Sequence, residues 1–136
     1  MKKIFLMLFL VLFFAGCATG ADGDDVVLIT ERFFSNQMQE IFLNHQQYLG
    51  SSVQYEGMFR TIVTRDGDEF FMVYRYSIGC CGEEIMGLEV DMNGLAIFPD
   101  NAWVEVRGVL DMDDGFLVLR PTWINEMNER GLELVQ

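Results

Sequence analysis

The sequence has 136 residues, enough for one domain, and its 21 acidic residues outnumber its 9 basic residues to give a formal net charge of −12. This acidity argues against nucleic acid and anionic membrane surfaces as partners, because both attract proteins through basic residues. Both lysines lie among the first three residues, so lysine-based covalent catalysis is excluded from the rest of the chain.

The first sixteen residues have the layout of an export signal. Lys2 and Lys3 precede an apolar run of eleven residues, 4–14. Such a run is too short to cross a bilayer core, which needs about twenty residues in a helix. It is therefore predicted to direct secretion rather than to form a transmembrane helix.

The end of this signal, Phe14-Ala15-Gly16-Cys17, resembles the lipobox of bacterial lipoproteins. In that family the signal peptidase cleaves before the cysteine, so we expect residues 1–16 to be removed and Cys17 to carry lipid such as palmitate. Residues 17–25, rich in glycine and aspartate, are predicted to be a flexible tether. The domain would then lie outside the cytoplasm, anchored to a membrane of the bacterial cell envelope. The alternative is a plain secretory signal with an incidental cysteine.

Past the tether the pattern is mostly that of strands. A short β-branched run precedes a helix predicted over residues 34–43, with Ser35 as its N-cap. The apolar face of this helix carries Met38, Ile41 and Phe42. Strands are predicted over residues 26–30, 53–63, 70–78, 85–92, 103–111 and 116–120, the last five being the main ones, with Asp-Gly and Asn-Gly turns between several of them.

Two of the main strands share a pattern in which apolar residues two apart are followed by a glycine. Gly57 and Gly108 occupy this position in residues 53–59 and 104–110. A glycine inside a strand weakens the strand unless the chain bends there or another backbone comes close, and a small closed barrel needs both. We therefore predict a mainly β fold for residues 26–136, a five-stranded OB-like barrel with a short N-terminal helix. The competing architecture is an open β-sandwich.

The chemically distinctive feature is the adjacent pair Cys80-Cys81, between the second and third main strands. These thiols could bind a soft metal such as zinc or copper, with Glu83, Glu84 or His45 completing the ligands. They could form a strained vicinal disulfide, since neighbouring Cα atoms lie about 3.8 Å apart and disulfides usually need at least about 4.4 Å. They could also be small buried thiols that only pack.

Residues 76–81, 87–90 and 103–108 together resemble the extracytoplasmic domain of the YcgQ-like family of bacterial membrane proteins. The resemblance extends over residues 26–121. It implies an OB-like accessory domain, usually paired with a YcgR-like permease, with no established reaction. Two departures are visible: Gly82-Glu83 replaces the family's alanine and aspartate after the cysteine pair, and a lipid anchor replaces the family's transmembrane helices.

Three functions follow from these patterns. The first is a lipid-anchored accessory or binding module, not an enzyme, that handles zinc through the Cys-Cys loop and partners a membrane permease or another envelope protein. The second is a thiol redox protein that uses Cys80 and Cys81. The third is a structural domain for protein interaction, which buried thiols would favour.

Overall fold

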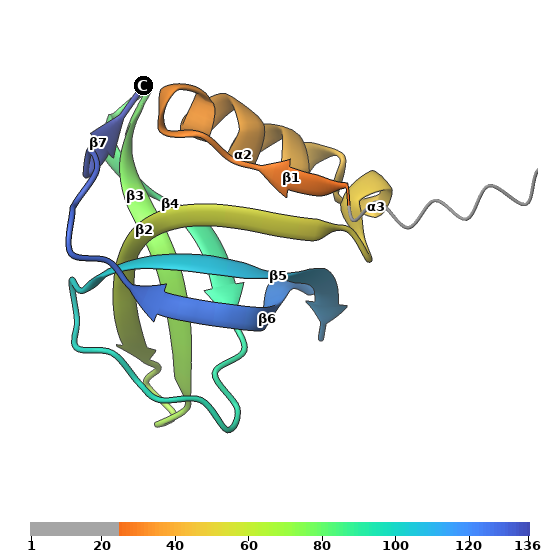
Figure 1. Cartoon of the computed structure of the whole chain (residues 1–136), viewed down its shortest axis with the longest axis vertical. Coiled ribbons are helices and arrows are strands. Elements are labelled where there is room, and N and C mark those ends of the chain that lie inside the picture. Colours follow the sequence, from red (N-terminus) through yellow and green to blue (C-terminus); the bar gives the residue numbers. More distant parts are fainter. Residues whose placement is uncertain (1–24) are drawn as a thin grey trace, which may run out of the picture.

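The computed structural model describes residues 25–136, which form one sheet of seven strands and three short helical segments (Figure 1). The predicted signal peptide, Cys17 and the predicted tether up to residue 24 lie outside the described residues. The elements in chain order are β1 (Val26–Leu28), η1 (Glu31–Phe33), α2 (Phe34–Leu43), α3 (His45–Tyr48), β2 (Ser52–Val63), β3 (Glu69–Gly79), β4 (Gly82–Val90), β5 (Trp103–Asp113), β6 (Phe116–Glu126) and β7 (Leu134–Val135).

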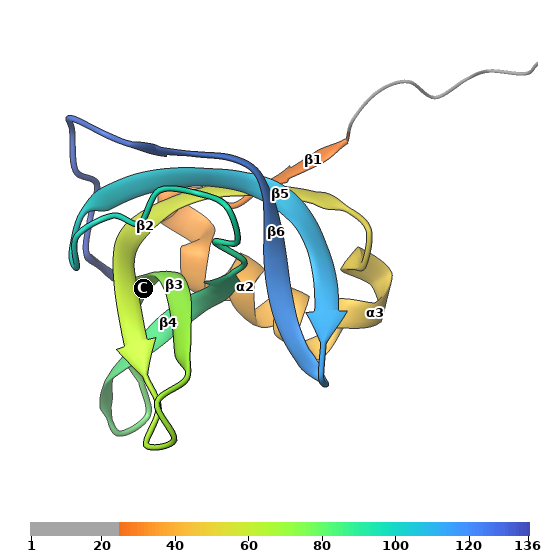
Figure 2. The ribbon, with the colours of Figure 1, turned by 90° about the horizontal axis from the view of Figure 1, so that it is seen from below.

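The five long strands, β2 to β6, close into a barrel. Antiparallel pairing joins β4 to β3, β3 to β2, β2 to β5 and β5 to β6, and a parallel contact between β6 and β4 completes the ring (Figure 2). The last contact consists only of Glu89↔Val118 and Val90↔Leu119, so the barrel is partly open there. The prediction of a mainly β, OB-like fold with a short helix is thereby confirmed.

The predicted count of five strands is wrong for the sheet as a whole, which has two more short strands. β1 pairs in parallel with β2, and β7 pairs in parallel with β3. β7 has two residues, too few for an alternating pattern to show in the sequence. β6 also continues to Glu126, past Pro121, because this proline faces Gly108 beside a bulge in the ladder, where a missing N–H is tolerated.

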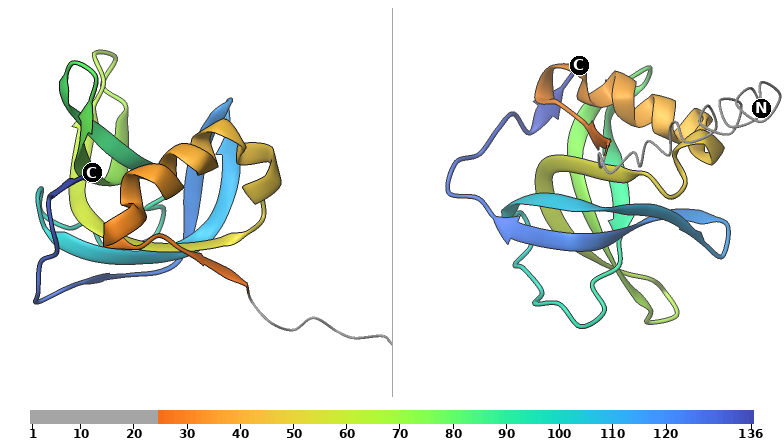
Figure 3. Two further views of the ribbon diagram at one scale, coloured as in Figure 1. Left: turned by 90° about the horizontal axis from the view of Figure 1, so that it is seen from above. Right: turned by 45° about the vertical axis from the view of Figure 1, so that its right-hand side comes forward.

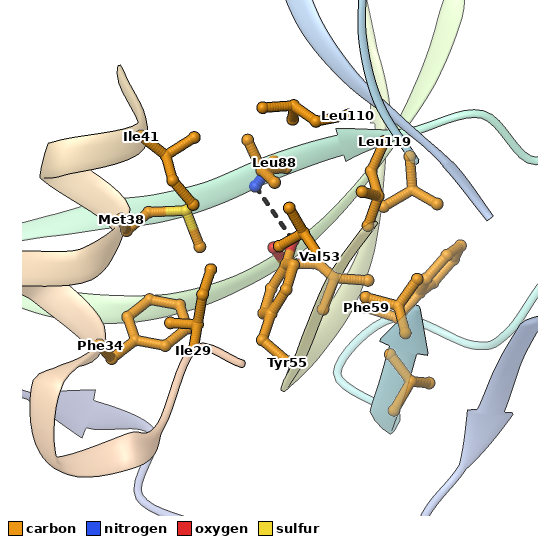
Figure 4. Close-up of a cluster of buried hydrophobic side chains, with 14 of the residues drawn as sticks. Ile29, Phe34, Met38, Ile41, Val53, Tyr55, Phe59, Leu88, Leu110 and Leu119 are labelled. Atoms are coloured by element: carbon orange, nitrogen blue, oxygen red, sulfur yellow. Dashed lines mark hydrogen bonds between the residues drawn. The ribbon is translucent and has the colours of Figure 1, made fainter. Parts of the chain in front are cut away.

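Tyr55 lies at the centre of the barrel core, and its hydroxyl makes two hydrogen bonds. The hydroxyl donates a hydrogen bond to the carbonyl of Val73 at 2.8 Å. It accepts one from the N–H of Leu88 at 3.2 Å (Figure 4). Burial raises the pKa of Tyr55 far above its ordinary value. The surrounding side chains are apolar and alternate along the strands: Val53, Phe59, Val104, Val106, Leu110 and Leu119.

Helix α2 lies across one open end of the barrel (Figure 3). Phe34, Met38 and Ile41 are buried, since they fall on one side of the helix at a spacing of four and three residues. Phe42 was predicted to share this face but is exposed, because it lies at the margin of the stripe. The helix therefore closes one end of the barrel.

The N-terminus of α2 is held by a contact with β3 rather than by a cap. Ser35 was predicted to cap the helix, but the N-cap position is Phe33, which makes no side-chain cap. The Ser35 Oγ instead lies 2.8 Å from the Oγ of Ser77, a buried residue near the end of β3. This bond fixes the start of the helix beside the β3–β4 hairpin.

The two mid-strand glycines are required by close backbone contacts. A Cβ at Gly57 would lie 2.7 Å from the carbonyl oxygen of Tyr74, and a Cβ at Gly108 would lie 2.4 Å from that of Arg120. Real Cβ atoms do not approach so closely, so a side chain at either position would push two strands apart. The prediction that another backbone comes close to both glycines is confirmed.

The substitution Gly108→Ala should lower the free energy of unfolding by about 2–3 kcal/mol, because the obstacle is main chain that cannot move alone. Gly79→Ala is the matched control. The nearest atoms to a Cβ there belong to the Glu84 carboxylate, the mobile end of a flexible side chain, so the cost should stay below about 1 kcal/mol. Urea titration of both variants measures the difference, and equal costs would contradict the packing described for Gly108.

One charged side chain, Arg75, is buried within the described part of the chain, with 3% of its surface exposed. Its Nε donates to the carbonyl of Glu56 at 2.8 Å. Its Nη1 donates to the Glu31 carboxylate at 2.9 Å and to the carbonyl of Leu132 at 3.0 Å. Arg75 thus joins β3 to β2, to the segment before α2 and to the segment before β7.

The carboxylate of Glu31 is the acidic partner of Arg75. A hydrogen bond from the N–H of Leu132, followed by the one from Arg75, holds the pKa of Glu31 below its ordinary value. A lowered pKa in the folded state means that the ionised carboxylate stabilises the fold. That contribution is present at neutral pH and is lost as the pH falls through the lowered pKa.

Candidate functional site

Cys80 and Cys81 form the two-residue turn between β3 and β4. Gly79 and Gly82, which flank them, are the last paired residues of the hairpin. Gly82 takes a positive φ of 131°, a conformation that other residues rarely adopt, and so allows the chain to reverse here. Both cysteines are free and exposed. The interpretation of the pair as buried packing thiols is therefore wrong.

The sulfur atoms of Cys80 and Cys81 lie 3.4 Å apart. A tetrahedral zinc ion with Zn–S bonds of about 2.3 Å holds two sulfurs about 3.8 Å apart. A disulfide requires about 2.05 Å. The observed separation is thus close to the spacing for shared metal coordination and well outside bonding distance for sulfur.

The other predicted ligands do not gather around the cysteines. Glu83 and Glu84 follow the turn but face opposite sides of β4, since they pair with Ile78 and Ser77 on alternate faces. Both are exposed. Among residues 25–136, no three His, Cys, Asp or Glu side chains are grouped closely enough to hold a metal ion.

His45 is placed far from the cysteine tip. It begins α3, beyond the C-terminal end of α2, and its Nδ1 lies 3.2 Å from the carbonyl of Phe42. The N-terminal end of α2 is the end that touches β3, through Ser35. A helix of ten residues is about 15 Å long, so His45 is separated from the β3–β4 hairpin by roughly that length.

An apolar surface accompanies the cysteine tip, and the sequence did not reveal it. Ile85, Tyr76 and Leu134 lie side by side across β4, β3 and β7, and Ile78 follows on the same face toward the turn. Ile78 is 56% exposed, and Ile85 and Leu134 are also largely exposed. We call Ile78, Ile85 and Leu134 the tip patch.

A second cluster of charged residues lies on the other half of the barrel, in β4 to β6. Arg120 bridges Asp91 at 2.8 Å and Asp111 at 2.7 Å. Burial, together with Asp113 and Asp91, raises the pKa of the neighbouring Glu89 carboxyl above its ordinary value. This cluster pairs its charges internally and has no soft ligand, so its chemistry is that of surface ion pairs.

Two solved structures resemble the fold at low similarity. The dimeric N-terminal domain of PriB from Thermoanaerobacter tencongensis has 14% identity and a TM-score of 0.34, and the match covers 57% of this chain and 97% of that one. The second OB-fold domain of replication protein A from Methanococcus maripaludis has 10% identity and a TM-score of 0.27, with 61% and 88% covered.

Comparison at the level of sequence places the chain more clearly. No curated protein matches it. Within the described residues, no helix is long and apolar enough to cross a membrane. The model of the DUF1980 C-terminal domain matches residues 16–121, more than half of the chain and all of the barrel except its last strand segments. The chain therefore belongs to the DUF1980 C-terminal domain family.

Proposed function

We propose that this domain is a binding module that holds a zinc ion on the thiolates of Cys80 and Cys81. The observation that carries the proposal is the pair of exposed sulfurs, 3.4 Å apart, on a two-residue turn. Two thiolates at this spacing reach one metal ion with small adjustment, and thiolates are preferred zinc ligands. The proposal includes no catalytic step, and within residues 25–136 no third His, Cys, Asp or Glu joins the pair as a metal ligand.

A thiol redox role is the second candidate, and the exposure of both thiols favours it as much as it favours zinc binding. Its difficulty is geometric. The sulfurs would have to approach from 3.4 Å to about 2.05 Å between neighbouring residues, whose Cα atoms are closer than disulfides usually allow. Zinc coordination needs the smaller movement, so it is the function we propose first.

Zinc binding is tested with the purified full chain, reduced and held in a mild detergent because of its apolar N-terminal run. All variants carry Cys17→Ser, so that Cys80 and Cys81 are the only thiols. The parent should retain zinc after gel filtration, measured by atomic emission, and Cys80→Ser or Cys81→Ser should lose it. Zinc retention by both serine variants, or no retention by the parent, would overturn the proposal.

We further propose that the module is anchored in the bacterial cell envelope by lipid on Cys17, as the lipobox pattern predicts. In cells, the wild-type chain should enter the detergent phase on phase separation, because acyl chains bind detergent micelles. The Cys17→Ala chain should not be cleaved. Because it keeps its apolar signal, it can also enter the detergent phase, so the second readout is the mass of the chain, measured by mass spectrometry. A wild-type chain without an added diacylglyceryl mass would contradict the anchor.

The partner that we propose is a membrane permease or another envelope protein, as the YcgQ-like resemblance implies. A thiol-directed crosslinker at Cys80 or Cys81 should capture a membrane protein in intact envelopes, and capture of soluble proteins alone would argue against this partner.

We propose no nucleic-acid partner, since 21 acidic residues oppose 9 basic residues and would repel phosphate groups.

A further inference from the structure

The zinc site proposed above is incomplete within the described residues of one chain. Structural zinc is bound by four ligands, most often cysteine and histidine. The tip offers the two sulfurs of Cys80 and Cys81, and the described residues place no third ligand beside them. The remaining positions must be filled from outside residues 25–136 of the same chain.

We infer that a second copy of this chain fills them, so that two hairpin tips share one zinc ion through four thiolates. This inference rests on the proposed zinc function and names the partner of that site. Each thiol that becomes a ligand releases its proton to solvent, and no electron is transferred. A twofold axis through the zinc ion makes the two halves equivalent, which is the commonest symmetry of protein dimers.

The shape of the hairpin allows two tips to meet. β3 pairs with the barrel strand β2 only as far as Tyr74, and β4 pairs with β6 only at Glu89 and Val90. The segment from Tyr76 to the turn extends beyond these contacts, at the end of the molecule where the short strand β7 and the start of α2 lie (Figure 1). The exposed turn can therefore be reached by the tip of a second copy.

The tip patch supplies apolar surface for the contact. Ile78 and Ile85 lie on one face of the hairpin within a few residues of the cysteines, and Leu134 extends that face onto β7. Exposed isoleucines beside a two-ligand site are covered when an identical tip is placed opposite. Contact with a second copy therefore removes this apolar surface from water.

The charges at the tip make the contact depend on zinc. Each tip carries Glu83 and Glu84, both exposed, within a chain of net charge −12. Two acidic tips repel each other, and salt weakens that repulsion. The four zinc–thiolate bonds, which form only when zinc is present, supply the attraction that overcomes it. We expect the metal-free protein to be a monomer.

The test measures mass and zinc content together by sedimentation equilibrium and atomic emission, on the full chain with Cys17→Ser in density-matched detergent. The expected result is a monomer with a chelator present and a dimer with one zinc ion per two chains at limiting zinc. A zinc-bound monomer would overturn the shared site but leave the zinc function intact, with water or a membrane partner as the further ligand. A protein that binds no zinc would overturn both.

A pair of surface variants tests the tip patch separately. Ile78→Gln combined with Ile85→Gln should weaken zinc-dependent dimerisation about tenfold while zinc still binds, because the apolar contact is lost and the thiols are kept. Val63→Gln is the matched control, since Val63 is 60% exposed and lies opposite Glu69, at the other end of β3. Equal dimerisation in the double variant and the control would contradict the role of the tip patch.

Discussion

Replacing Arg75 with alanine should lower the free energy of unfolding by about 3 kcal/mol and the melting temperature by roughly 10 °C. The guanidinium of Arg75 packs against two aromatic rings, with 5.2 Å to the Phe34 centroid and 4.8 Å to the Trp103 centroid. The variant would lose these contacts, leave a cavity between α2 and the barrel and remove the hydrogen bonds to Glu31 and to two carbonyls. Urea titration at pH 7 measures the loss.

Arg120→Ala is the control for this prediction. Arg120 also makes two ion pairs, but 45% of its side chain is exposed, so its removal should lower stability far less than the removal of Arg75. If both arginine variants lost the same stability, burial would not be the reason for the effect at Arg75. A small loss at Arg75 would also mean that the N-terminal and C-terminal segments do not depend on this side chain.

The parts of the fold that could be predicted are those with strong local patterns. The long strands are rich in apolar and β-branched residues and are separated by turn signals, and the positions of Gly57 and Gly108 indicated close strand contacts. The helix predicted before the first long strand is α2, although its predicted N-cap, Ser35, lies inside the helix. These features depend on neighbours in sequence, and a single sequence contains that information.

The parts that could not be predicted depend on distant contacts. Arg75 and Ser77 stood out only as polar residues in an apolar strand, and nothing near them in sequence indicated Glu31, Leu132 or Ser35 as partners. The two residues of β7 gave no pattern, although they pair with β3 and extend the tip patch.

The same distinction between local patterns and distant contacts applies to the candidate site. The cysteine pair could be recognised, because its members are adjacent in the chain. The placement of His45 beyond the far end of α2 could not, since it follows from where the helix packs. The exposure of both thiols could not be predicted either, because a strand end can lie in a core or project from it. That projection is the property on which the proposed function depends.

The exposed pair should react as a unit with an aryl arsenical of the type R–As=O. One arsenic atom forms two As–S bonds with Cys80 and Cys81 and releases one water molecule, which requires both sulfurs to be accessible and close together, as they are at 3.4 Å. In the folded, zinc-free protein with Cys17→Ser, one equivalent of phenylarsine oxide should remove both free thiols. Thiol titration and intact mass spectrometry measure the product.

The variants and an oxidant separate the remaining interpretations. Cys80→Ser should form only a single-bonded adduct that excess monothiol reverses, because the second As–S bond cannot form. Thiols that react only after unfolding would contradict the exposed tip, and with it the zinc site and the shared dimer. If diamide treatment blocked the arsenical, dithiothreitol restored the reaction and the blocked protein kept the mass of a single chain, the pair would be shown to form a vicinal disulfide. The redox function would then take precedence over zinc binding.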